Sequence, residues 1–491
     1  MNILEKHFDK FRSNIIGIDY TFEGPFGKKK IVYADWVASG RLYYPIEKVI
    51  IERFGPLVAN THSESSVSGT STTKAYKEAK SIIKKHVNAG REDVILFAGF
   101  GMTAAVNKLQ RLLGLRVDEH LQKYTSIPKD ERPVVFLTHM EHHSNQTSWL
   151  ETICDVVIIE PDEMGLVNLE HFEHLLKLYE HRQLKIGSFT AASNVTGIQP
   201  PYHLMAKMIH KHEGICFVDF AAAAPYVNIN MLPVAPDEKL DGIFFSPHKF
   251  LGGPGTSGVL IFDSKLYNRR VPDLPGGGTV DWTNPWGEHK YIEDIEMRED
   301  GGTPGFLQAI KTALCIKLKE KMGVNNILQR EHELLQKTFQ CFDKIHSLHV
   351  LAKDNKERLG IISFYVEDVH YNLMVKLLND RYGIQLRGGC SCAGTYGHYL
   401  LHVDPTRSKR ITDKINQGDF SEKPGWVRFS LHPTMTNDEL GFILTAIEEV
   451  VANAKDWSKD YIYSSKTNEY YHKSLKGTEH EEIKNWFLLE D

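Results

Sequence analysis

Seven short runs of β-branched and aromatic residues between residues 94 and 262 limit the possible folds of this chain more than any other feature. Amphipathic segments at 168–182 and 203–213 separate several of these runs. This alternation is typical of a sheet covered by helices on both faces. We therefore predict an α/β fold with a mostly parallel, seven-stranded sheet formed by residues 94–97, 134–138, 155–159, 185–190, 215–219, 242–246 and 258–262.

After residue 305 the pattern changes to two long helical stretches followed by strand candidates. The helical stretches cover 306–323 and 324–345, the strand candidates are 359–366, 384–387 and 426–431, and a last helix runs from Asn437 to about Asn453. This order predicts a second, smaller α+β domain. The expected organisation is an N-terminal segment at 1–32, a large domain at 33–304, a small domain at 305–453, and a surface extension or partly disordered tail at 454–491.

Composition and charge exclude several classes of function. The chain has 491 residues, 42% hydrophobic and 25% charged, and its net charge of -5 provides no basic field for a nucleic-acid partner. No apolar stretch approaches the ~20 residues that a membrane helix needs, and charges interrupt the N-terminal stretch, unlike a signal peptide. The six cysteines are too scattered for a disulfide framework, so we expect reduced thiols and a cytoplasmic protein without a nucleic-acid or membrane partner.

Ligands of such sheets bind beyond the carboxyl ends of the strands, so the residues that follow each run are the candidate site. Gly99 and Gly101 follow the first run and precede a helix whose N–H groups, with the Thr103 hydroxyl, could hold a phosphate. The same glycines also fit a plain strand-to-helix connection. His142 and His143 follow the second run, where they could stack on an aromatic cofactor, hold a metal or fill the loop.

Further strand ends carry Asn194, Asp219 and Lys249. Asp219 is the acid at an otherwise apolar strand end; a buried carboxylate there needs a cationic partner, unless it caps a helix. Lys249 follows Ser246 and His248 and precedes a glycine-rich turn that lets the backbone approach a bound group. A lysine for a Schiff base, an acid for a pyridine nitrogen and an anion cradle together suggest pyridoxal 5'-phosphate (PLP).

From "YADWVASGRLYYP" at 33–45 to "WVRFSLHPTMTNDEL" at 426–440, the chain resembles the class V aminotransferase-like enzymes of fold type I, and among them the cysteine desulfurases. "SPHKFLGGPGTSGVL", "EHHSN", "GMTAAVN", "SNVTG", "VDFA" and "REDGGTPGF" carry the resemblance. It implies that the large domain binds PLP and that the protein is a homodimer. The implied cofactor contacts are the Schiff base at Lys249, the phosphate at Met102, Thr103, Ser246 and His248, ring stacking by the catalytic His142, the ring hydroxyl at Asn194, the pyridine nitrogen at Asp219, and the neighbouring subunit's phosphate at Thr303.

"QLRGGCSCAGTYGHYLL" at 385–401 resembles the loop on which desulfurases carry their cysteine, five positions after an arginine. By this resemblance, the thiolate of Cys392 attacks the sulfur of L-cysteine, giving a persulfide and L-alanine, and the sulfur then passes to an acceptor. Lys249 removes the α-proton. Arg428 matches the arginine that pairs with the substrate carboxylate, and Arg387 and Asn194 are further substrate contacts.

Three features depart from the family pattern. Ala222 stands where desulfurases usually have a glutamine that holds the ring hydroxyl, and Asp300 stands where the family usually has glutamate. The stretch 402–425 is longer than in typical desulfurases, and we expect it to form a surface loop over the site entrance.

Two other interpretations remain open at this stage. The chain could be another class V enzyme, such as a C–S lyase, a selenocysteine lyase, an aminotransferase or an epimerase, in which Cys392 has no chemical role. It could also be a zinc-binding interaction module, because four ligand-type side chains lie within a short stretch. These are Cys390, Cys392, His398 and His402.

Overall fold

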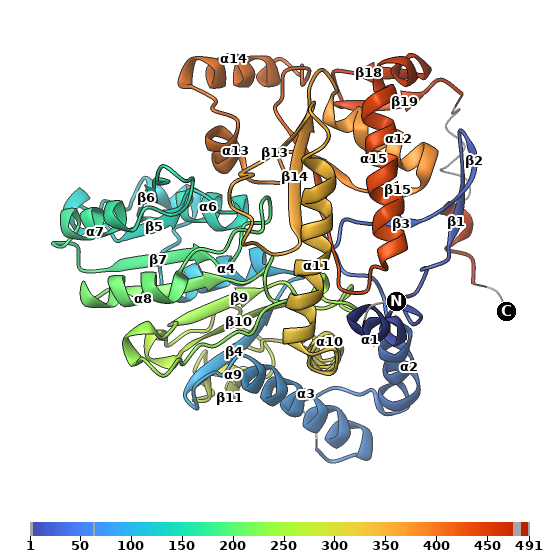
Figure 1. Ribbon diagram of the computed structural model, residues 1–491. Coiled ribbons are helices and arrows are strands. Elements are labelled where there is room, and N and C mark those ends of the chain that lie inside the picture. Colours follow the sequence, from blue (N-terminus) through green and yellow to red (C-terminus); the bar gives the residue numbers. More distant parts are fainter. Residues whose placement is uncertain (1–2, 62–63, 475–482, 490–491) are drawn as a thin grey trace.

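The computed structural model describes residues 3–61, 64–474 and 483–489, and a seven-stranded sheet lies at its centre (Figure 1). The strands β5, β6, β7, β8 and β9 pair in parallel, whereas β10 is antiparallel to both β9 and β4. The prediction of a mostly parallel, seven-stranded sheet is therefore confirmed. In spatial order the strands are β4 (Asp93–Ala98), β10 (Gly258–Asp263), β9 (Gly242–Phe245), β8 (Ile215–Asp219), β7 (Lys185–Thr190), β5 (Val134–Thr138) and β6 (Asp155–Ile159).

Helices cover both faces of this sheet because its strands are apolar on both sides. In β4, Val94 and Leu96 belong to one core cluster together with α4, whereas Ile95 between them belongs to the other. The covering helices are α3 (Val67–His86), α4 (Met102–Leu112), α6 (His143–Leu150), α7 (Leu169–Leu178), α8 (Tyr202–Lys211) and α10 (Phe306–Met322). Among the helices in the described ranges, none combines the length and apolar character that a membrane crossing requires.

The C-terminal part contains a four-stranded antiparallel sheet beside long helices, which confirms the predicted α+β architecture, although the strand at Leu348–Val350 was not predicted. The strand order is β13 (Leu348–Val350), β14 (Ile361–Val366), β17 (Trp426–Ser430) and β16 (Arg387–Gly389). The helices are α11 (Val324–Phe342), α12 (Tyr371–Tyr382) and α15 (Asn437–Trp457). This architecture is α+β, and the domain boundaries themselves stay predictions.

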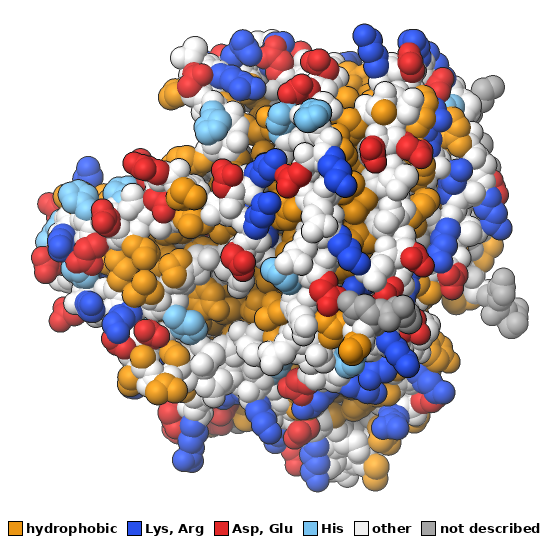
Figure 2. Space-filling model, in the orientation of Figure 1, with side chains coloured by type: hydrophobic (Ala, Val, Ile, Leu, Met, Phe, Trp, Pro, Cys, Tyr) orange, Lys and Arg blue, Asp and Glu red, His pale blue; other side chains and the backbone are white. Residues whose placement is uncertain are grey.

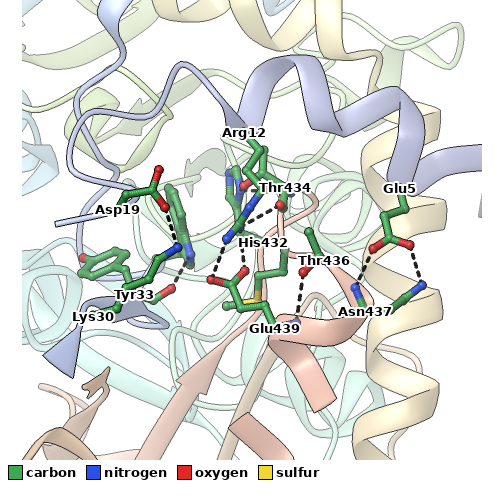
Figure 3. Close-up of polar contacts among 12 residues, drawn as sticks. Glu5, Arg12, Asp19, Lys30, Tyr33, His432, Thr434, Thr436, Asn437 and Glu439 are labelled. Carbon is green, nitrogen blue, oxygen red and sulfur yellow. Dashed lines mark hydrogen bonds and ion pairs between the residues drawn. The ribbon is translucent and has the colours of Figure 1, made fainter. Parts of the chain in front are cut away.

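The N-terminal segment packs against the C-terminal part of the chain. Arg12 at the end of α1 (Ile3–Arg12) contacts both carboxylate oxygens of Glu439, at 2.6 and 3.1 Å (Figure 3). Glu5 accepts hydrogen bonds from the backbone and side chain of Asn437, at 2.8 and 2.7 Å. After the hairpin β1 (Thr21–Gly24) and β2 (Gly27–Lys30), β3 (Val32–Tyr33) pairs in parallel with β15 (Ile384–Gln385). These contacts fix the start of the chain relative to α15 (Asn437–Trp457) and β15.

The prediction of a loop at 402–425 is wrong, because Pro405–Asn416 forms the helix α14. Asp404 caps it by accepting hydrogen bonds from the backbone N–H groups of Thr406 and Arg407, and Pro405 occupies the first turn, where its missing N–H costs nothing. These start signals are present in the sequence, but the polar composition of the segment obscured them.

The tail beyond α15 contains a hairpin that its sequence pattern did not reveal. Strands β18 (Tyr461–Ser464) and β19 (Glu469–His472) pair antiparallel, and the Tyr461 hydroxyl donates to Asp380 at 3.0 Å. Residues 475–482 and 490–491 of the tail lie outside the described residues. On the face drawn in Figure 2, Lys and Arg side chains are interspersed with Asp and Glu, in keeping with the small net charge.

Candidate active site

A single cavity of about 700 Å³ brings together nearly all the site residues predicted from the sequence. It lies at the carboxyl ends of the central strands and is completed by segments of the C-terminal part. Thr303 is not among the lining residues and lies exposed after α9 (Ile295–Arg298). The predicted residues that line it are Met102, Thr103, His142, Asn194, Asp219, Ser246, His248, Lys249, Arg387, Cys392 and Arg428.

Lys249 and Asp219 share this cavity because β8 and β9 are neighbouring parallel strands. Asp219 ends β8, and Lys249 lies in the turn that follows β9. Burial raises the pKa of Asp219 to about 6, although its carboxylate accepts a hydrogen bond from Ala221 N at 2.8 Å. Burial lowers the pKa of Lys249 to about 8, against the opposing effect of Asp219. Such a lysine is more easily deprotonated than one in water, which suits a nucleophile or a base.

The N-terminus of α4 forms one wall of the cavity. The Met102 N–H donates to Ser246 Oγ at 2.8 Å, which joins the helix to the turn after β9. A Cβ at Gly101 would lie 3.1 Å from Ser246 Oγ and 3.8 Å from the His248 ring. The glycine therefore keeps open a space between a helix N-terminus, a hydroxyl and an imidazole, which is a suitable environment for a phosphate. The Thr103 hydroxyl lies 2.7 Å from that of Ser144.

The two histidines after β5 have different positions. His142 lines the cavity and caps α6, because its Nδ1 accepts a hydrogen bond from Ser144 N at 3.1 Å. Burial, with a smaller contribution from Lys249, lowers the pKa of His142 to about 3, so its ring is neutral near pH 7. His143 instead accepts the Gly394 N–H at Nε2, at 2.8 Å. The position of His142 at the cavity agrees with the resemblance, which gave the first histidine of the motif a place at the ring and gave His143 no role.

The cysteine segment between β16 and α13 (Gly394–Leu400) forms a tight turn at the cavity. Ser391 and Cys392 both have left-handed backbone conformations, with φ of 51° and 56°, which is uncommon for residues other than glycine. Asn194 Nδ2 donates to Ser391 O at 2.7 Å, and Trp426 Nε1 donates to Ser391 Oγ at 3.2 Å. The thiol of Cys392 is free and exposed at the cavity wall, which a nucleophile needs.

Arg428 and Arg387 are joined through an acid that the sequence analysis missed. Arg428 Nη2 lies 2.8 Å from Asp35 Oδ1, and Arg387 Nε lies 3.1 Å from Asp35 Oδ2. Arg428 is buried, and its Nη1 also donates to the backbone oxygen of Asn194 at 3.3 Å. The only signal for Asp35 in the sequence is an acid within the otherwise apolar stretch "YADWV".

Two buried polar atoms at the cavity lack hydrogen-bond partners among the described residues. They are Nε of Arg428 and Oδ1 of Asn194. Buried groups of this kind are normally satisfied, and each unmade hydrogen bond costs free energy. A guanidinium donor suits a carboxylate and an amide oxygen suits a hydroxyl, so the residues present fit PLP together with an amino acid.

The structure does not gather the four proposed zinc ligands. Among the described residues, no group of three or more His, Cys, Asp and Glu side chains is placed to hold a metal ion. Both ring nitrogens of His398 lie within hydrogen-bond distance of other atoms, Gly394 O at 2.7 Å and Ser408 Oγ at 2.8 Å. Of the two residues that depart from the family pattern at single positions, Ala222 lines the cavity, whereas Asp300 lies outside it and accepts hydrogen bonds from Tyr76 and Lys80.

Comparison with known proteins identifies the family of the chain. The family model described as aminotransferase class-V matches residues 32–442. A protein of Halalkalibacterium halodurans, named "Probable cysteine desulfurase", is 26% identical over 367 residues, which cover 74% of this chain and 84% of that protein.

Solved structures share the fold. The apo structure of a cysteine desulfurase from Thermococcus onnurineus NA1 matches with a TM-score of 0.70 at 24% identity, covering 86% of this chain and 95% of that one. An S-sulfonic acid form of a cysteine desulfurase from Escherichia coli matches with a TM-score of 0.70 at 20% identity, covering 91% and 98%. The predicted type I fold is confirmed.

Proposed function

The chain belongs to the class V aminotransferase family, and from that premise we propose that it is a PLP-dependent cysteine desulfurase. One observation carries the proposal: the thiol of Cys392 is exposed at the wall of the same cavity that holds Lys249 and Asp219. A cofactor lysine with its acid is expected in any family member, whereas a reactive thiol beside them is needed to remove sulfur from a substrate. The relatives named as cysteine desulfurases support this choice.

The residues that would hold PLP are those placed around the cavity. Lys249 would bind its aldehyde carbon, Asp219 would pair with the pyridine nitrogen, and His142 would pack against the ring. The Met102 N–H, Thr103, Ser246 and His248 would hold its phosphate, and Asn194 would contact its ring hydroxyl. PLP supplies an electron sink that stabilises negative charge on the α-carbon of a bound amino acid.

The chain's own residues bind the substrate and move its protons. Arg428 binds the carboxylate of L-cysteine through its unpartnered Nε, assisted by Arg387. Lys249 takes the α-proton, a role that its lowered pKa favours. Ala222, which stands where a longer side chain is usual, leaves the hydroxyl contact to Asn194.

Sulfur transfer then uses the thiolate of Cys392. It attacks the substrate sulfur; a sulfur–sulfur bond forms, the substrate carbon–sulfur bond breaks, and the carbon takes up a proton to become the methyl group of L-alanine. L-Cysteine and one protein thiol thus give L-alanine and one protein persulfide, with no other reactant. The persulfide is then passed to a sulfur acceptor, either a protein or a small thiol.

Assembly and location complete the proposal. We place the enzyme as a homodimer in which the exposed Thr303 reaches the phosphate of the neighbouring subunit. All six cysteines are free, which suits the reducing cytoplasm.

Product analysis tests the proposal. After incubation of the PLP-loaded protein with L-cysteine, we expect L-alanine, with sulfide released in equal amount by added reductant. Pyruvate and ammonia instead of L-alanine would indicate a C–S lyase, a requirement for a 2-oxo acid would indicate an aminotransferase, and D-cysteine would indicate an epimerase. Turnover of L-selenocysteine with none of L-cysteine would indicate a selenocysteine lyase, and each of these results would contradict the proposed function.

A further inference from the structure

Asp35 lies between the two arginines that face the substrate carboxylate. Its two oxygens are divided between them, Oδ1 at 2.8 Å from Arg428 Nη2 and Oδ2 at 3.1 Å from Arg387 Nε. The side chain of Arg428 is 3% exposed and that of Arg387 is 48% exposed, so the pair has one buried and one half-exposed cation. Asp35 therefore contacts both arginines, although it does not itself line the cavity.

Strand contacts hold Asp35 in this position. The Ser430 N–H donates to the backbone oxygen of Ala34 at 2.9 Å, and Val37 N–H donates to Ser430 Oγ at 3.2 Å. Asp35 pairs with Ser430 in an isolated parallel bridge. Ser430 lies on β17, two residues after Arg428. A carboxylate on a paired backbone segment keeps a fixed geometry to the guanidinium, as a positioning residue requires.

The charges at this subsite favour one negative group on the ligand. Arg428 and Arg387 carry two positive charges, and Asp35 balances one of them. The remaining positive charge matches a single α-carboxylate. Arg111, a further guanidinium among the described residues that line the cavity, is already paired with Asp273 at 2.7 Å. A second anionic group on the substrate side chain would therefore find no unpaired guanidinium there and would be repelled by Asp35.

We propose that Asp35 sets the charge of the carboxylate subsite, so that the enzyme accepts amino acids with one carboxylate and rejects those with a second anion. This inference rests on the proposed function, because it takes an amino acid as the ligand and Arg428 as its carboxylate partner. Asp35 acts through the arginines and does not touch the reacting atoms. It is a specificity-determining residue that no motif of the sequence identified.

The test compares binding of L-alanine and L-aspartate, which differ in charge and contain no sulfur. Spectrophotometric titration of the PLP-loaded protein gives a dissociation constant for each. In the wild type we expect L-alanine to bind more tightly than L-aspartate. The selectivity is the dissociation constant of L-aspartate divided by that of L-alanine. In Asp35→Asn we expect this ratio to fall by at least about tenfold, because one repulsive charge in a partly buried site is removed. Asp35→Glu keeps the charge and should keep the wild-type ratio within about twofold.

Further variants separate this role from a structural one. A structural loss at Asp35 would weaken both ligands equally and leave the ratio unchanged, and thermal unfolding shows whether each variant is folded. If Asp35→Asn does not fold, Arg387→Gln serves in its place: removal of one cation should move the ratio further against L-aspartate. An unchanged ratio in the folded Asp35→Asn, equal binding of both ligands by the wild type, or no shift in Arg387→Gln would overturn the inference. Failure of the proposed function appears separately, as loss of L-alanine production from L-cysteine while binding selectivity persists.

Discussion

The backbone N–H of His143 donates to the carbonyl oxygen of Cys392 at 2.7 Å, so the loop after β5 holds the cysteine segment at the cavity. The side chain adds a second contact, because Nε2 of His143 accepts the Gly394 N–H at 2.8 Å. His143 therefore holds the turn that carries Cys392, whereas His142 lines the cavity.

Removal of the His143 ring should slow sulfur transfer without affecting the cofactor. In His143→Ala we expect kcat for persulfide formation to fall about three- to tenfold, which corresponds to one lost hydrogen bond, and KM for L-cysteine to change little. The absorbance of bound PLP serves as the control and should be unchanged. His143→Gln offers an oxygen acceptor in place of Nε2 and should recover part of the rate. Equal kcat in His143→Ala and wild type would contradict this role.

Addition of a methyl group at Gly101 should weaken PLP binding. The new Cβ would lie 3.1 Å from Ser246 Oγ, in the space that the phosphate needs. We expect the dissociation constant of PLP for Gly101→Ala to rise by about tenfold or more, because one misplaced phosphate hydrogen bond costs about 1.5–3 kcal/mol. Fluorescence titration of the apoprotein measures this constant. Gly277→Ala is the matched control, since a Cβ there meets nothing within 4 Å. If Gly101→Ala binds PLP as tightly as this control, the space beside Gly101 is not the phosphate site.

Glu331 should make the stability of the protein pH-dependent. It is buried in α11, and burial raises its pKa from 4.5 to about 8, against a smaller lowering effect of the Gly360 N–H. Between these two pH values the folded state holds a proton that the unfolded state has lost. Stability from this group is therefore fully present below pH 4.5 and is lost as the pH rises through 8.

Glu331→Gln replaces the titrating carboxyl group with an amide that does not titrate. The thermal midpoint of the variant should rise relative to wild type as the pH increases from 5 to 8, and the exposed control Glu163→Gln should show no such trend. Calorimetry at several pH values gives both series. Parallel curves for wild type and Glu331→Gln across this range would show that Glu331 is ionised in the folded protein.

The central sheet and most of the cavity could be predicted because their signals are local. Each strand is a short apolar run, and residues such as Asp219 and Lys249 directly follow a run, where the carboxyl ends of parallel strands meet. Asp35 could not be found this way, because its partner Arg428 lies 393 positions along the chain. The helix α14 was missed because its sequence is strongly polar, with Ile411 and Ile415 as its aliphatic side chains, and most of its side chains face solvent.

The location of the transferred sulfur tests the central claim most directly. Wild-type protein loaded with PLP is treated with L-cysteine, alkylated and digested, and peptides are identified by mass spectrometry beside Cys390→Ser and Cys392→Ser. We predict that one extra sulfur atom is found on Cys392 in the wild type and in Cys390→Ser, and that Cys392→Ser forms neither persulfide nor L-alanine while it retains the absorbance of bound PLP. L-Alanine formation by Cys392→Ser at the wild-type rate, or sulfur found on a cysteine outside the cavity, would contradict the account.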